Sequence, residues 1–153
     1  MLNREQKMVG MTKRTYIYAN VYDSRNAEKV RLGSNVHILP LSRTSILVSV
    51  TNGEEAQRIV RRIPGVRKIM LQFDIDNDLC NGCYNCVAAC PGNSLNELIT
   101  NWDEPFTTDQ YVLRITNGDL SANRVDKCRR VTGDKNCQTC MLACPFKAVT
   151  VKS

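Results

Sequence analysis

Eight cysteines lie close together in the second half of this chain of 153 residues, and their thiols are the groups best suited to chemistry. None occurs in the first 79 residues. The first group of four is Cys80, Cys83, Cys86 and Cys90, and the second is Cys128, Cys137, Cys140 and Cys144. Disulfides usually join segments that are distant in the sequence, so this clustering favours metal ligation.

The two groups are copies of one motif. Residues 83–95, CYNCVAACPGNSL, and residues 137–149, CQTCMLACPFKAV, match at each cysteine and at the proline that follows the last one. These prolines are Pro91 and Pro145, and an alanine precedes the last cysteine in both copies. The match indicates an internal duplication of the site.

The spacing of the cysteines predicts iron–sulfur clusters. The first group has gaps of two, two and three residues, and the second has gaps of eight, two and three. A cubane cluster needs four thiolates at tetrahedral corners, and a loop with short gaps can supply three while its amides donate hydrogen bonds to the sulfurs. The fourth cysteine lies where a short helix begins, so in a duplicated domain it points to the other cluster.

We therefore predict two 4Fe-4S clusters as cofactors, with crossed ligand sets. Cluster I would be bound by Cys80, Cys83, Cys86 and Cys144. Cluster II would be bound by Cys128, Cys137, Cys140 and Cys90. The alternative is a pair of four-cysteine zinc sites, which usually consist of two Cys-x2-Cys knuckles without a final Cys-Pro.

Residues 73–153 resemble the bacterial-type ferredoxins that hold two 4Fe-4S clusters, on the evidence of both cysteine groups and their Cys-Pro ends. The resemblance implies an α+β fold in which short strands and two short helices surround two cubane clusters. It also implies that the strand LQFDIDNDLC, before the first loop, pairs with the closing strand AVTVKS. The segments CNGCYNCVAACPGN and ITNGDL are similar to those of the ferredoxin-type subunits of archaeal formylmethanofuran dehydrogenases.

The chain departs from a minimal ferredoxin between the two groups. The 37 residues between Cys90 and Cys128 contain an insertion at about 96–122. Within this stretch, residues 111–125 predict a hairpin that turns at Asn117-Gly118. Trp102, Pro105 and Phe106 form either a contact surface for a partner or a local cap over a cluster.

A second departure is the gap of eight residues before Cys137, with the sequence RRVTGDKN. It places Arg129, Arg130 and Lys135 beside cluster II. Positive charge favours the reduced, more negative cluster, so we expect cluster II to have a higher potential than cluster I. The alternative is a solvated loop with little electrical effect.

The charge distribution divides the chain near residue 73. Residues 1–72 carry 13 Lys and Arg against 5 Asp and Glu, a net +8, whereas residues 73–153 carry 8 against 10, a net −2. We predict a flexible N-terminus at 1–12, a small basic α/β domain at 13–72 and a ferredoxin domain at 73–153. The basic domain is expected to serve as a docking unit that cluster binding does not require.

Periodicity predicts a βαβ unit within the basic domain. Strands are expected at 15–22, 44–50 and 66–74. A helix is expected over 51–63, with Thr51 and Glu54 as a capping box and Pro64-Gly65 as its end. No catalytic motif occurs in this unit.

A cubane bound by four cysteines has no open coordination site, so we predict low-potential one-electron transfer and not catalysis on this chain. The predicted partners are redox subunits that act as electron donor and acceptor within an anaerobic, hetero-oligomeric oxidoreductase. Each oxidised cluster would add about −2 to the formal charge of +6, which removes the main support for nucleic-acid binding.

The chain is also predicted to be cytoplasmic. No apolar run approaches the ~20 residues that span a bilayer, and the start MLNREQKMVGMTKR has charges where a signal peptide is apolar. Two alternatives to a complex subunit stay open: a ferredoxin fused to a ligand-sensing or sulfur-handling module, and a freely diffusing ferredoxin.

Overall fold

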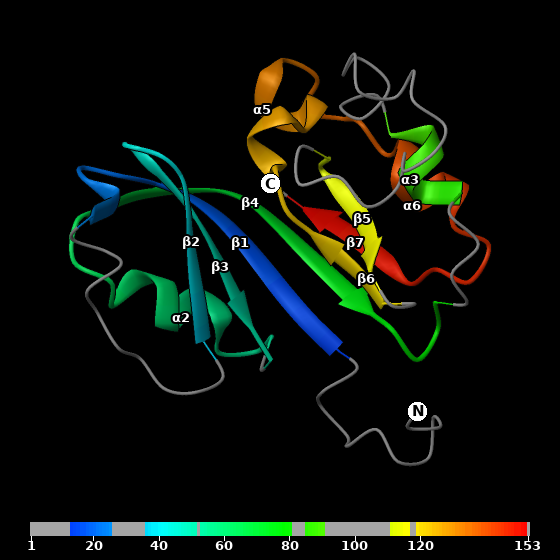
Figure 1. Cartoon of the computed structure of the whole chain (residues 1–153), viewed down its shortest axis with the longest axis horizontal. Helices are drawn as coiled ribbons and strands as arrows, with labels where there is room; N and C mark the ends of the chain where they lie inside the picture. Colours follow the sequence, from blue (N-terminus) through cyan, green and yellow to red (C-terminus); the bar gives the residue numbers. More distant parts are fainter. Residues whose placement is uncertain are drawn as a thin grey trace.

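The computed structural model describes residues 13–25, 36–51, 53–80, 85–90, 111–116 and 119–152 (Figure 1). The predicted flexible segment 1–12 lies outside the described residues, as do Cys83, Pro91 and most of the predicted insertion, including Trp102, Pro105 and Phe106. None of the helices in the described part has the length and apolar character that crossing a bilayer requires.

The fold is a mixed α and β arrangement around one antiparallel sheet. Its strands, in sheet order, are β2 (Val36–Ser42), β3 (Ser45–Val50), β1 (Lys13–Val21), β4 (Val66–Asp76) and β7 (Val149–Lys152). A separate hairpin consists of β5 (Leu113–Thr116) and β6 (Asp119–Ala122). The helices are α2 (Ala56–Arg61), α3 (Asn85–Ala89), η3 (Val125–Lys127), α5 (Arg129–Thr132) and α6 (Thr139–Ala143).

The predicted strand, helix and strand of the N-terminal half are present as β3, α2 and β4. Both strands run antiparallel to β1, which lies between them, so β3 and β4 are parallel to each other without being neighbours. The helix thus carries the chain across β1, and the βαβ unit is split by the first strand.

The start of α2 differs from the prediction. The helix begins at Ala56, and Glu55, without a side-chain cap hydrogen bond, occupies the N-cap position that the capping box assigned to Thr51. A turn precedes the helix instead, in which the Ala56 amide donates to the Gly53 carbonyl at 3.4 Å. The helix ends before Pro64 as expected, and Gly65 takes a φ of +85°, which favours glycine.

The sheet buries a different core on each face, because successive side chains of a strand point to opposite sides. The helix-side core, under α2, consists of Ile17, Ala19, Val21, Ile46, Val48, Val50, Ala56, Val60 and Ile63. The cysteine-side core includes Tyr16, Tyr18, Leu71, Phe73, Ile75, Cys86, Cys90, Leu113, Val125, Cys128 and Val151. Adjacent residues of β1 therefore belong to different cores.

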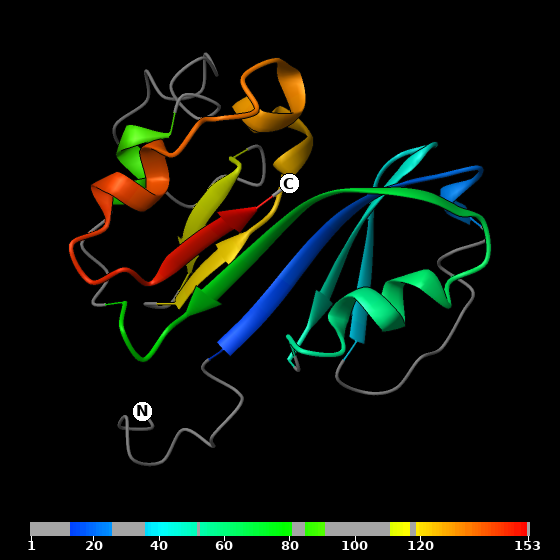
Figure 2. The ribbon, with the colours of Figure 1, turned by 180° about the vertical axis from the view of Figure 1, so that it is seen from behind.

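The long strands β1 and β4 connect the two halves of the molecule, as Figures 1 and 2 both show. The boundary predicted between residues 72 and 73 falls inside β4, which continues from Val66 to Asp76. Tyr16 pairs with Phe73 and Tyr18 with Leu71, so β1 of the basic unit supplies side chains to the cysteine-side core. The sheet runs through the predicted boundary without interruption.

Two predictions about the ferredoxin region are confirmed by the strand pairing. β4 pairs with the closing strand β7, from Gln72 with Lys152 to Ile75 with Val149. The hairpin is present as β5 and β6, and its expected turn, Asn117-Gly118, lies outside the described residues. The Asn77 side chain connects this hairpin to the end of β4, because it hydrogen-bonds both the amide and the carbonyl of Leu120.

Candidate metal centre

Four cysteines line a single cavity beside the cysteine-side core. They come from two stretches of chain that are distant in sequence, and they are Cys90, Cys128, Cys137 and Cys140. These are the four residues that the crossed assignment gives to cluster II. The rest of the wall consists of Phe73, Val112, Leu113, Val151, Arg129 and Arg130.

Short hydrogen-bonded turns position these cysteines. The amide of Cys90, just after α3, donates to the Cys86 carbonyl at 3.1 Å. Cys128 stands between two short helices: its amide donates to the Val125 carbonyl at 2.9 Å, and its carbonyl accepts from Val131 at 2.9 Å. Cys140 lies within α6, three residues after Cys137.

The two copies of the cysteine motif meet through their helices. α3, from the first copy, packs against α6, from the second, and both views show them side by side. Cys90 follows α3 and Cys144 follows α6, so the last cysteine of each copy lies at the end of a helix that contacts the other copy, and not at the start of a helix as the sequence predicted. This packing brings Cys90 to the cavity of the second group.

Three of the four residues predicted for cluster I are described. Cys80 follows the turn after β4, Cys86 lies in α3 and Cys144 follows α6, while Cys83 lies outside the described residues. The Cys144 sulfur accepts a hydrogen bond from the Ala148 amide at 3.3 Å. The Asp76 amide donates to the Ala148 carbonyl at 2.8 Å, so the turns that hold Cys80 and Cys144 adjoin each other.

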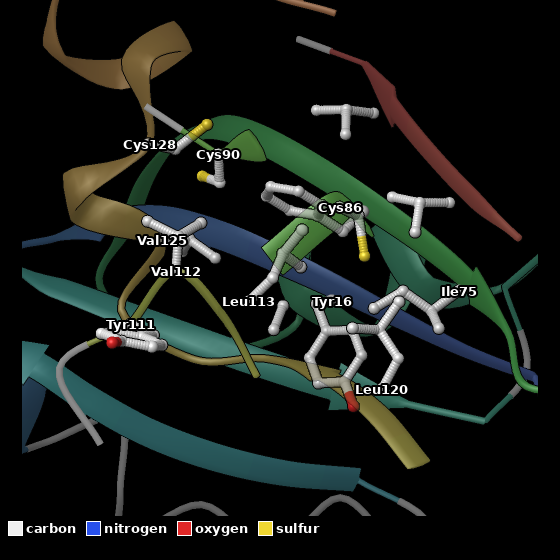
Figure 3. Close-up of a cluster of buried hydrophobic side chains, with 14 of the residues drawn as sticks. Tyr16, Ile75, Cys86, Cys90, Tyr111, Val112, Leu113, Leu120, Val125 and Cys128 are labelled. Atoms are coloured by element: carbon white, nitrogen blue, oxygen red, sulfur yellow. The ribbon is translucent and has the colours of Figure 1, made fainter. Parts of the chain in front are cut away.

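Apolar side chains surround five of the described cysteines and limit their contact with water. Figure 3 shows Cys86, Cys90 and Cys128 among the buried side chains of the cysteine-side core. Cys80 and Cys140 are half-buried and pack against the same core. A bound group would therefore sit where electrostatic interactions are less screened than at the surface.

Burial, with a smaller contribution from neighbouring cysteines, raises the pKa of the Cys128 thiol to about 11 and that of Cys140 to about 12. For Cys128, the backbone amide and the charge of Arg130 act in the opposite direction and lower the pKa. Thiolates, not thiols, bind metals, so a cation must stabilise the anionic form of these buried groups.

The chemistry of the donor set fits a cubane cluster. Four thiols share one largely apolar cavity, and thiolates are the ligands that hold 4Fe-4S clusters. Within the described residues, no three Cys, His, Asp or Glu side chains converge on a single-ion site. A cubane does not need such convergence, because each of its four irons takes one cysteine.

Several wall residues were not identified as site residues from the sequence. Val112 and Leu113 belong to the predicted hairpin, and Phe73 and Val151 to the paired strands β4 and β7. In the sequence, only the alternation of apolar and polar residues indicated that one face of each strand would be buried. Arg129 and Arg130 lie at the cavity as expected, whereas Lys135 is exposed and is not among its lining residues.

Comparison with known proteins supports 4Fe-4S cluster binding by this chain. Residues 73–96, which include the first cysteine group, match the 4Fe-4S binding domain family. A stretch of 53 residues is 34% identical to a subunit of the tungsten-containing formylmethanofuran dehydrogenase 2 of Methanopyrus kandleri, and it covers 34% of this chain and 67% of that protein. The chain belongs to the ferredoxin-type 4Fe-4S iron–sulfur proteins. No solved structure matches it.

Proposed function

We propose that this chain passes single electrons through two 4Fe-4S clusters as the iron–sulfur subunit of a larger anaerobic oxidoreductase. The observation that carries the proposal is the cavity lined by Cys90, Cys128, Cys137 and Cys140, which unites four thiols from both copies of the motif. A bound 4Fe-4S cluster would supply one-electron redox chemistry there. Catalysis on a substrate is expected to take place on another subunit.

The protein's own residues would hold the clusters and exclude water. Cys90, Cys128, Cys137 and Cys140 are proposed to bind cluster II, with Phe73 and Leu113 as part of an apolar wall. The remaining cysteines, Cys80, Cys83, Cys86 and Cys144, are proposed to bind cluster I. All eight ligands would be thiolates, which leaves no open iron site for a substrate.

Two observations favour a complex subunit over a freely diffusing carrier. The similar protein from Methanopyrus kandleri is named as a subunit of a dehydrogenase. In addition, large apolar side chains are exposed next to proposed cluster I ligands: Leu79 precedes Cys80, and Leu142 and Phe146 stand on either side of Cys144. An exposed apolar surface next to a redox centre favours contact with a protein partner.

The metal content tests the proposal directly. Protein purified without oxygen is expected to contain about eight iron and about eight acid-labile sulfide per chain, since two cubanes hold four of each. Chemical iron and sulfide assays, with zinc measured on the same sample, decide the result. Stoichiometric zinc without sulfide would contradict the proposal and support two structural zinc sites.

The contact with a partner is tested by charge substitution at the exposed apolar residues. Leu142→Glu and Phe146→Glu are expected to weaken assembly with the partner subunits about tenfold each, which corresponds to about 1.4 kcal/mol. The measurement is the recovery of the same subunits with each variant from the native host, under anaerobic conditions. Leu39→Glu is the matched control, because Leu39 is also exposed but lies on β2, away from the cysteines. Equal recovery with all three variants would contradict this docking surface.

A further inference from the structure

Arg130 contacts the cavity of the second cysteine group in three ways. It is among the lining residues together with Cys90, Cys128, Cys137 and Cys140. Its side-chain Nε donates a hydrogen bond of 2.7 Å to the Cys137 carbonyl. Its backbone amide hydrogen-bonds Cys128, and its charge favours the Cys128 thiolate. One residue therefore connects two of the four cysteines and brings a positive charge to them.

Three cations occur in the eight-residue gap, and the structure separates them. Arg130 is half-buried and lines the cavity, Arg129 lines the cavity from an exposed position, and Lys135 is exposed and not among the lining residues. Exposed charges are screened by water and salt, whereas partly buried ones are screened less. Arg130 should thus have the largest electrostatic effect on a bound cluster.

In the sequence, no arginine occupies the corresponding gap of the first cysteine group. The corresponding gap, between Cys80 and Cys83, consists of Asn81 and Gly82, which carry no charge. Two carboxylates precede Cys80 instead: Asp76, the last residue of β4, which pairs with Lys13 at 3.8 Å, and Asp78 in the turn that follows. Exposed charges of the other sign adjoin both centres, since the Asp134 carbonyl accepts from the Cys137 amide and the Lys147 amide donates to the Cys144 carbonyl. The half-buried charges are the ones that differ, with Arg130 at the second group and Asp76 before the first.

We propose that Arg130 raises the reduction potential of cluster II above that of cluster I, so that the first electron taken up by the protein resides on cluster II. This inference rests on the proposed function, because it requires both clusters. On reduction a cluster gains one electron and its core goes from 2+ to 1+, with no bond made or broken. Including four thiolates, the charge of the site changes from about −2 to −3, and a nearby positive charge stabilises the reduced form more.

The test is a potentiometric titration with dithionite as electron donor, followed by EPR, on the full chain with both clusters bound. The signal that Cys140→Ala alters identifies cluster II, because Cys140 belongs to the second group in a crossed or an uncrossed assignment. Arg130→Gln is expected to lower the equilibrium constant for reduction of cluster II about tenfold, or about 59 mV for one electron, and to leave cluster I unchanged.

Further variants separate charge from hydrogen bonding. Arg130→Lys keeps the charge, so the potential of cluster II should stay close to that of the parent protein. Lys135→Gln is the matched control and should change the potential of neither cluster. Arg129→Gln should lower the potential of cluster II by less than Arg130→Gln, and it provides the test if Arg130→Gln fails to bind cluster II. Equal shifts in Arg130→Gln and Arg130→Lys, or no shift in any arginine variant, would overturn the inference.

The iron content of each variant distinguishes this inference from the proposed function. A parent protein without cubane clusters would overturn both. Intact clusters in the parent and in the variants, with potentials that do not depend on Arg130, would overturn only the role of Arg130 and leave electron transfer as the proposed function.

Discussion

The Cys90→Ala variant is expected to lose the cluster held by the second cysteine group and to retain the one whose ligands begin at Cys80. The reason is that Cys90 lines the same cavity as Cys128, Cys137 and Cys140, although it belongs to the first group in sequence. About half of the iron should be lost, since each cubane holds four of about eight irons. The measurement is iron content together with EPR of the reduced protein.

Cys86→Ala is the matched control for this variant. Cys86 and Cys90 are close in sequence, at α3 and directly after it, and their exposed fractions are 5% and 6%. Removal of either thiol therefore disturbs the same part of the core by a similar amount. With crossed ligand sets the two variants alter different EPR signals. If both altered the same signal, Cys86 and Cys90 would bind one cluster and the crossed assignment would be wrong.

Deletion of residues 1–65 is expected to abolish cluster binding. The deletion removes β1, β2, β3 and α2, and it leaves β4 without its hydrogen-bonding partner on one side. It also removes Tyr16 and Tyr18 from the core that contains Cys86, Cys90 and Cys128. This expected loss of the clusters differs from the prediction made from the sequence, in which the N-terminal unit serves only for docking. Full iron content in the truncated chain would show that the ferredoxin region folds by itself.

A point variant tests, without a deletion, whether cluster binding depends on the stability of the whole sheet. Ile17→Ala opens the helix-side core, on the face of β1 opposite the cysteines, and should cost about 2–5 kcal/mol. If the sheet unfolds as one unit, thermal melting followed by circular dichroism and by cluster absorbance should shift together. Arg61→Ala, at an exposed position of α2, is the control and should shift neither curve. Loss of secondary structure without loss of cluster absorbance would show independent units.

The sequence by itself determined the chemistry of the site, because the types of the residues and the short gaps between them decide which group they can bind. Two cysteine quartets that end in Cys-Pro predicted iron–sulfur binding, which the family match supports. The pairing of β4 with β7 and the hairpin of β5 and β6 were also predictable, since alternation and a turn signal are local features. The capping box at Thr51 and Glu54 was a wrong prediction, because a backbone turn at Gly53 precedes the helix instead.

Only the tertiary structure decided how the two halves are joined. Charge and composition change near residue 73, but hydrogen bonding continues through β4, because a strand is defined by its neighbours and not by its charge. The insertion of β1 between β3 and β4 depends on pairing between residues far apart in sequence, such as Tyr16 with Phe73. The half-buried position of Arg130, in contrast to exposed Lys135, likewise follows from the packing of α5 against the core, which no local pattern in RRVTGDKN specifies.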